Sequence, residues 1–263
     1  MKKIGMLLLA ALPLFAVSCG DDNKEPDPVD INFDLTQLNI NFGETGQLKC
    51  NIDGAQITSS NPFVATVDPS GKVTAKHVGE TKIKASIDGY STTATVIVSG
   101  TNNNFTTPLL LWGSRLEDIR LKALQDNNLV EVQNTTEGSL SFTTAGNFPV
   151  YAYSFIDNRL TAAGLTVTEA QDEEGNMYEF LTQRYKEYGE DAETGATYFC
   201  DADNVKDATV VLEYGMDLES EDDLFNVIWR ENSSTKTRAN GGINRVDFDD
   251  CRAILRQAAK NVR

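Results

Sequence analysis

The side chains of this 263-residue chain that are candidates for catalysis, metal binding or covalent modification are four cysteines, one histidine and several runs of acids. Cys19 stands apart, because it follows a basic start and a short apolar stretch. A thiol is nucleophilic under mild conditions, so Cys19 is a candidate for covalent modification. The other three, Cys50, Cys200 and Cys251, are an odd number and do not form a disulfide framework. Cys200 and Cys251 could still pair, but only if their Cα atoms approach within about 7 Å.

Residues 1–18 have the features of a secretory signal peptide. The chain begins with Met-Lys-Lys, and residues 4–17 are apolar except for Gly5 and Pro13. Small residues close the stretch, as at a signal-peptide cleavage site. The apolar run is too short to cross a hydrocarbon core of about 30 Å as a helix. We therefore expect residues 1–18 to be removed from the mature protein.

Residues 16–19 (AVSC) resemble the lipobox of bacterial lipoproteins. The resemblance implies that the thiol of Cys19 receives a diacylglyceryl group and that Cys19 becomes the new amino terminus; two or more acyl chains anchor a protein stably. Residues 20–23 (GDDN) look like the acidic stretch of surface lipoproteins of the Bacteroides group. That likeness implies lipid anchoring in the outer membrane, facing the cell exterior. Residues 19–30 are rich in acids and proline, so we expect an extended tether.

The charge of the chain excludes one class of partner. The formal net charge is −16, and there is no glycine-rich phosphate loop of the usual spacing. Nucleic-acid binding needs clustered lysine and arginine to contact phosphates. We therefore expect no nucleic-acid partner, and the acidity suits solubility on a cell surface.

Residues 31–99 alternate between apolar and polar side chains. In residues 81–87, for example, Thr81, Ile83 and Ala85 point one way while Lys82 and Lys84 point the other. Period-two alternation between turns that contain glycine predicts an all-β sandwich. We place this domain at residues 31–100.

The amino-acid sequence of residues 57–98 resembles the bacterial immunoglobulin-like group 2 (BIG2) domain. The motifs that carry the resemblance are residues 59–62 (SSNP), 64–67 (VATV), 70–73 (SGKV) and 79–83 (GETKI). Ile57 departs from the family, which often has tryptophan there. The resemblance implies an immunoglobulin-like sandwich, and such domains act as spacers and adhesive modules on bacterial surfaces. Fold alone does not fix a ligand.

Residues 101–263 predict an α+β domain, which begins at the polar break of residues 101–104. We expect a helix that opens with a capping box at residues 114–117, a second helix over residues 174–188, and a closing helix from about Asp247. Strands are expected at residues 140–144, 150–156, 196–200, 209–214 and 224–229. This order predicts helices packed on one side of an antiparallel sheet.

Tyr151, Tyr153 and Phe155 share one face of a predicted strand and form the candidate ligand platform. Exposed, the three rings could stack on sugar rings. Buried, they would be the core side of a sheet, and burial is the favoured interpretation because aromatic side chains supply much of a core's apolar area.

No catalytic or metal-binding set emerges, so we expect neither catalytic residues nor a cofactor or metal. Residues 217–223 (DLESEDD) could bind Ca²⁺ through oxygens, but they lack the central glycine and closing glutamate of an EF-hand loop. His77 has no second ligand nearby in sequence and is expected to lie exposed at an edge. A catalytic serine triad in residues 101–263 would need His77, which lies in the predicted sandwich domain of residues 31–100.

These observations lead to three hypotheses about function. The first is a non-enzymatic, surface-exposed lipoprotein, in which an immunoglobulin-like spacer presents a carboxy-terminal domain that binds a glycan or a protein. The second is a glycan hydrolase that uses paired carboxylates. The third is an assembly subunit of an envelope complex, which would show a large exposed apolar patch.

Overall fold

The computed structural model describes residues 30–262 except for residues 127–128, 133–136, 145–146 and 233–245. The predicted signal peptide, Cys19 and nearly all of the tether therefore lie outside the described residues. Strands predominate among the described residues, which form fifteen strands and four helices. Within the described part of the chain, no helix is both long enough and apolar enough to cross a bilayer.

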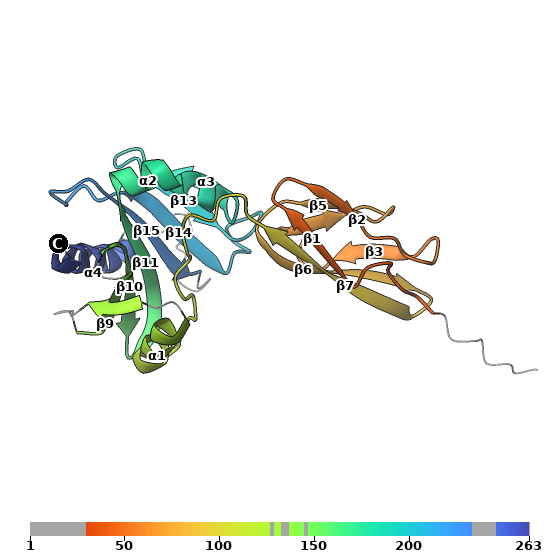
Figure 1. The fold of residues 1–263 in the computed structure, drawn as a ribbon, viewed down its shortest axis with the longest axis horizontal. Helices are drawn as coiled ribbons and strands as arrows, with labels where there is room; N and C mark the ends of the chain where they lie inside the picture. The colour runs from red at the N-terminus through yellow and green to blue at the C-terminus, as the bar shows by residue number, and fades with distance from the viewer. Residues whose placement is uncertain (1–29, 127–128, 133–136, 145–146, 233–245, 263) are drawn as a thin grey trace, which may run out of the picture. The chain divides into compact units, whose positions relative to one another are not determined.

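Residues 37–99 form two sheets in a sandwich-like arrangement (Figure 1). The first sheet has the order β1-β7-β6-β3, with strands β1 (Gln37–Asn41), β7 (Tyr90–Ser99), β6 (Gly79–Ile87) and β3 (Gln56–Ser59). The second has the order β2-β5-β4, with strands β2 (Thr45–Gln47), β5 (Lys72–Ala75) and β4 (Ala65–Val67). β1 pairs with β7 in parallel, and the other pairs are antiparallel.

The period-two pattern places one face of these strands in a shared core. Thr81, Ile83 and Ala85 are buried in β6, whereas Lys82 and Lys84 are exposed. Side chains from both sheets meet in one apolar cluster. The expected β-sandwich is confirmed in this coarse form, and the BIG2 assignment stays a prediction.

The carboxy-terminal part is built on one antiparallel sheet of eight strands, in the order β12-β13-β14-β15-β11-β10-β9-β8. The strands in chain order are β8 (Leu129–Val132), β9 (Ser139–Thr144), β10 (Asn147–Ile156), β11 (Arg159–Thr168), β12 (Lys186–Glu190), β13 (Thr197–Cys200), β14 (Val210–Met216) and β15 (Leu224–Glu231). The helices are α1 (Leu116–Asp126), α2 (Glu169–Gly175), α3 (Met177–Thr182) and α4 (Val246–Val262).

Helices cover both faces of this sheet, so the expectation of helices on one side is wrong. Ala152 of β10 packs in a cluster with Phe248 and Leu255 of α4. Its neighbour Tyr153 points to the opposite face and shares the main core with Phe180 of α3. Both faces of β10 are therefore buried, and the closing helix α4 is where the sequence predicted it.

The expected helix over residues 174–188 is also corrected. α2 ends at Gly175, and Asn176, whose backbone is left-handed (φ 50°), caps both the end of α2 and the start of the short helix α3. α3 ends at Thr182, and Tyr188 lies in the edge strand β12, which pairs with β13. Tyr178 and Leu181 therefore lie in α3, Tyr185 in the bend that follows and Tyr188 in β12, so tertiary pairing overrides the helical spacing of these four side chains.

The predicted capping box of α1 is replaced by a contact from a distant turn. The backbone N–H of Leu116 donates to Oδ1 of Asn158 at 3.2 Å. A capping box does form at α2, where Thr168 and Gln171 each accept a backbone N–H of the other. That arrangement satisfies two N–H groups that a helix start leaves unpaired.

Candidate functional site

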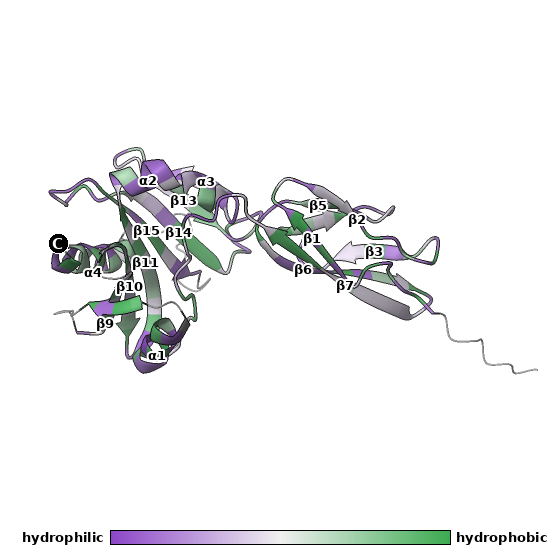
Figure 2. Cartoon of the chain, in the orientation of Figure 1, coloured by the Kyte–Doolittle hydropathy of each residue, from purple (hydrophilic) through white to green (hydrophobic). Residues whose placement is uncertain are grey.

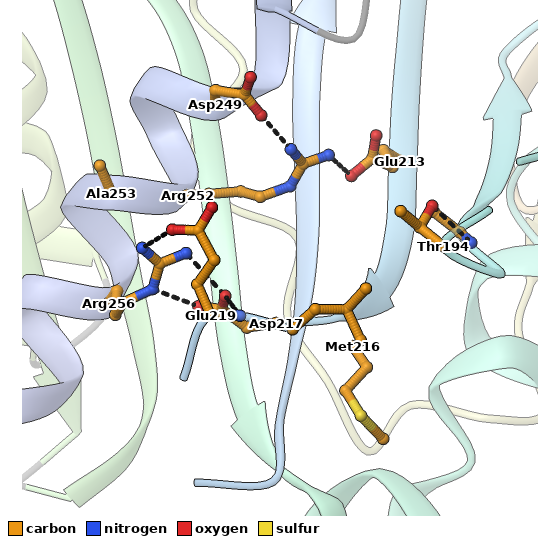
Figure 3. A pocket seen from close by; sticks show the side chains of 11 residues that line it. Thr194, Glu213, Met216, Asp217, Glu219, Asp249, Arg252, Ala253 and Arg256 are labelled. Atoms are coloured by element: carbon orange, nitrogen blue, oxygen red, sulfur yellow. Dashed lines mark hydrogen bonds and ion pairs between the residues drawn. The ribbon is translucent and has the colours of Figure 1, made fainter. Parts of the chain in front are cut away.

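A pocket of about 390 Å³ lies between α4 and the end of β14 (Figure 3). Its lining residues are Thr194, Ala196, Glu213, Met216, Asp217, Leu218, Glu219, Asp249, Arg252, Ala253 and Arg256. The volume falls within the range of about 300–1,000 Å³ that is usual for small-ligand sites. We call this hollow the α4 pocket.

Two arginines on α4 organise the charges of the α4 pocket. Arg252 and Arg256 are four residues apart, so they lie on the same face of the helix. Arg252 pairs with Glu213 of β14 and with Asp249 of α4. Arg256 binds Asp217 in a bidentate manner, with Nη2–Oδ1 at 2.7 Å and Nε–Oδ2 at 3.0 Å. Figure 3 shows the guanidinium group of Arg252 between Asp249 of α4 and Glu213, and that of Arg256 beside Asp217 and Glu219.

The two strand-side acids are buried and the two others are exposed. The side chains of Glu213 and Asp217 are 5% and 2% exposed. Those of Asp249 and Glu219 are 57% and 79% exposed. The hydrogen bond to Asp217 raises the pKa of Arg256. Charge-assisted bidentate pairs of this kind are strong and directional, so they fix α4 on the sheet.

The carboxylate of Glu213 has a hydrogen-bond partner at only one of its two oxygens. One of its oxygens accepts from Arg252, while Oε2 is buried without a hydrogen-bond partner. Tyr198 lies opposite Glu213 in the β13–β14 register. Burial, and then the charge of Glu213, raise the pKa of Tyr198 to about 12. Tyr198 therefore stays neutral beside the carboxylate over the physiological range.

The candidate platform is in the core. Tyr151, Tyr153 and Phe155 are 6%, 0% and 8% exposed and belong to the main apolar cluster. The Tyr153 hydroxyl accepts from the backbone N–H of Leu109 at 3.2 Å. A hollow of about 80 Å³ reaches Tyr151 and Tyr153, well below the usual lower limit of about 300 Å³. The hypothesis of an exposed ligand platform is therefore wrong, and the favoured interpretation, that the three rings are buried in the core, is confirmed.

The calcium hypothesis for residues 217–223 is also corrected. Asp217 and Glu219 both bind Arg256 instead of converging on an empty centre. Among the described residues, no group of three or more His, Cys, Asp or Glu side chains could hold a metal ion. Two acids of this segment, Asp217 and Glu219, are thus partners of α4.

The cysteines of the described residues are all free. Cys50 is half-buried, whereas Cys200 and Cys251 are buried, so the possible disulfide is absent. Cys251 packs in the α4 cluster with Leu255, and the thiol of Cys200 contacts the carbonyl of Ala202 at 3.3 Å. Burial raises the pKa of Cys251 to about 12, which leaves little thiolate for nucleophilic attack.

His77 is half-buried instead of exposed. Its ring stacks on Phe63, with 3.8 Å between centroids and 5° between planes. Its Nδ1 lies 2.8 Å from the carbonyl oxygen of Phe63. Burial lowers the pKa of His77, so the neutral ring is favoured. These contacts give His77 a packing role.

The polar break at residues 101–104 is hydrogen-bonded to the helices of the carboxy-terminal part. The side chain of Gln183 accepts from the backbone N–H groups of Thr101 and Asn102 at 2.9 and 3.1 Å. Asn102 donates through Nδ2 to the carbonyl of Gly175 at 2.8 Å. The segment is therefore fixed to the α2–α3 corner, which its polar composition did not predict.

The sequence interpretation missed the α4 pocket. Its available signals were a glutamate inside the apolar strand pattern of β14 and two arginines one helical turn apart. Neither signal indicates which residues pair, because the partners lie far apart in the sequence: Asp217 and Arg256 are separated by 39 residues.

No model of a protein family matches this chain, and no curated protein matches it. Among solved structures, domains 4 and 5 of the S-layer protein SbsC are 22% identical with a TM-score of 0.24, over 27% of this chain and 51% of that one. This chain thus spans about half of that structure. Domains 5–6 of the same S-layer protein are 15% identical, with a TM-score of 0.24, over 79% and 86% of the two chains. Human protocadherin-24 EC1-2 is 12% identical, with a TM-score of 0.23, over 76% and 93%. Scores this low carry no argument about function.

Proposed function

We propose that this chain is a non-enzymatic lipoprotein of the outer membrane, anchored through Cys19 and facing the cell exterior. Residues 31–100 serve as a BIG2-type spacer, and residues 101–263 bind a partner at the α4 pocket. The amino-terminal part of the proposal rests on the lipobox resemblance of residues 16–19. The binding part rests on one observation, the concave α4 pocket with its ordered set of charges.

The arginine pairs favour binding over hydrolysis. A carboxylate-based glycosidase needs one acid that donates a proton and a second that attacks or activates water. In the α4 pocket, Glu213, Asp217, Glu219 and Asp249 each accept from an arginine. Carboxylates bound in this way are suited to hold a fixed surface of charge, which is the property that recognition of a polar partner requires.

The test uses the purified full-length protein in detergent. It is assayed for turnover against polysaccharide, peptide and ester panels, and for retention on a glycan array. We expect no turnover. Robust turnover that is lost in Glu213→Gln, but kept in Asp118→Asn, would overturn the non-enzymatic proposal in favour of the hydrolase. Asp118 is a suitable control because it also pairs with an arginine, on the exposed face of α1 and outside the α4 pocket.

A further inference from the structure

A second hollow, of about 270 Å³, lies where α2 meets β10, β11 and the segment before α1. We propose that this hollow, which we call the α2 pocket, binds one neutral sugar residue. Its apolar lining comes from Phe105, Pro149 and Val167, and its polar lining from Asn104, Gln171 and Glu174. It shares no residue with the α4 pocket, so the proposal goes beyond the binding role given to that pocket and does not depend on it.

The protein holds the two amides of the α2 pocket in fixed orientations. Nδ2 of Asn104 donates to the carbonyl oxygen of Gly175 at 3.1 Å. Oε1 of Gln171 accepts from the backbone N–H of Thr168 at 3.2 Å, and its Nε2 donates to the carbonyl oxygen of Phe148 at 3.2 Å. Because a carbonyl only accepts and an N–H only donates, these contacts determine which end of each amide is the oxygen. The pocket is therefore ordered before a ligand enters, which lowers the entropic cost of binding.

Two acceptors and one donor of the lining are left for a ligand. Within the described part of the chain, neither Oδ1 of Asn104 nor the exposed carboxylate of Glu174 contacts a donor, and one N–H of the Gln171 amide has no acceptor. Gln171 and Glu174 are three residues apart on α2, so they lie on the same face of the helix.

This mixture of acceptors and a donor selects the chemistry of the ligand. An ammonium has donors for the two acceptors but no acceptor for the N–H of Gln171. A carboxylate accepts from that N–H but has no donor for Asn104, and Glu174 repels it. A hydroxyl group both donates and accepts, so neighbouring hydroxyls on one sugar ring can satisfy all three groups.

The apolar side of the α2 pocket suits the C–H face of a sugar ring. Phe105 and Pro149 line it and are only half-buried. A Cβ atom at Gly175 would stand 2.3 Å from Cζ of Phe105, so the glycine lets this ring form the wall of the pocket. The face of an aromatic ring carries partial negative charge, which attracts the partly positive C–H groups of a sugar. The volume is close to the lower limit of about 300 Å³ for small-ligand sites, which suits one ring and not a longer chain.

The experiment uses saturation-transfer NMR on the full-length protein in a detergent without a sugar headgroup. The neutral probes are the methyl glycosides of glucose, galactose, mannose and N-acetylglucosamine. Methyl glucuronide carries a carboxylate on the same kind of ring, and butylammonium carries a positive charge without hydroxyls. We expect at least one neutral glycoside to bind with a millimolar dissociation constant, more tightly than both charged probes. Its affinity should not change with salt, because no net charge is paired.

A pair of variants on α2 locates the site. Glu174→Ala and Glu173→Ala each remove one exposed carboxylate from neighbouring positions of the helix, but only Glu174 lines the α2 pocket. We expect Glu174→Ala to weaken glycoside binding by about fivefold or more, and Glu173→Ala to leave it unchanged. Phe105→Leu keeps an apolar side chain but removes the aromatic face, so it should weaken binding as well. If Phe105→Leu does not fold, the two glutamate variants still decide the matter.

Three results would overturn the proposal: no binding of any of the four neutral glycosides, equal losses in Glu174→Ala and Glu173→Ala, or tighter binding of butylammonium than of every glycoside. The α4 pocket is tested separately by Asp249→Asn, which should not change glycoside binding because Asp249 lines only that pocket. A protein that binds no glycoside would lose the α2 site and keep the proposed role of the α4 pocket. Turnover of a panel substrate would remove the non-enzymatic assignment and leave the α2 site standing.

Discussion

Gly164 of β11 lies directly beneath Leu255 of α4. A Cβ atom built at Gly164 would stand 2.7 Å from Cδ1 of Leu255 and 3.1 Å from Sγ of Cys251. Real Cβ atoms essentially never come within 3.0 Å of another heavy atom, and the distance to Leu255 is shorter than that limit. The missing side chain therefore lets α4 pack closely on the sheet, and this packing brings Arg252 to Glu213 of β14 and Arg256 to Asp217, which directly follows β14.

Gly164→Val should therefore destabilise the protein. Overfilling a packed core costs about 1–3 kcal/mol, and we expect a loss of this size in urea unfolding of the full-length protein. Gly189→Val is the control, since a Cβ atom at Gly189 meets nothing within 4 Å. Valine suits a strand, so that variant should be neutral or slightly stabilising.

Adding Leu255→Ala to Gly164→Val separates a clash from a general effect of valine. If the Leu255 side chain is the obstacle, the double variant will lose less stability than the sum of the two single variants. Strict additivity would contradict the packing argument.

The strand that carries Gly164 also shows where sequence patterns stop being informative. β6 was predictable because one of its faces meets water, which gives the alternation of Ile83 with Lys82 and Lys84. Nearly all of β11 is buried on both faces, so no alternation marks it, and its alanines and glycine are poor strand formers. Figure 2 colours much of β11 as hydrophobic, in keeping with that burial.

The candidate site, too, could be predicted from the sequence only in part. The closing helix α4 was predicted from its apolar stripe, which includes Phe248, Cys251 and Leu255. Which acids its arginines meet depends on the angle and depth at which α4 packs, and both are set by long-range contacts such as the one at Gly164. The aromatic row of β10 was placed on one face correctly, and the second layer of helices decided that this face is buried.

Removing the guanidinium of Arg256 should be costly. In Arg256→Met the buried carboxylate of Asp217, 2% exposed, loses its bidentate partner. Breaking a buried ion pair from one side typically costs about 3 kcal/mol or more, because an uncompensated charge is left behind. Urea unfolding checks the size. Arg115→Met removes an exposed pair with Asp118, and it should change stability by about 1 kcal/mol or less. Similar losses in both variants would show that Asp217 does not depend on Arg256.

His77 should make the protein less stable in mild acid. Burial lowers the pKa of His77 below its ordinary value of 6.5, so the native state binds the proton less readily than the unfolded state does. The contribution of neutral His77 is therefore complete above pH 6.5 and is lost as pH falls through the lower native pKa.

The variant His77→Phe keeps a ring for stacking on Phe63 but cannot titrate. Its unfolding free energy should fall less steeply than that of the wild type as pH drops below 6.5. Equal slopes in the two proteins would mean that His77 does not govern this loss. Comparing slopes also removes the contribution of the carboxylates, because both proteins share them.

Cys19→Ala should abolish acylation and release the protein from the membrane. Cys19 is the cysteine that directly follows the signal-like segment of residues 1–18. A stable anchor requires two or more acyl chains, so losing the thiol that receives the diacylglyceryl group leaves no attachment. Metabolic labelling with a fatty-acid analogue, followed by membrane fractionation, measures both effects. Cys50→Ala is the control, because Cys50 lies at a β-bridge with Phe33 and should keep full labelling. Label that persists in Cys19→Ala would contradict the lipoprotein proposal and leave the binding role of the α4 pocket to be judged by itself.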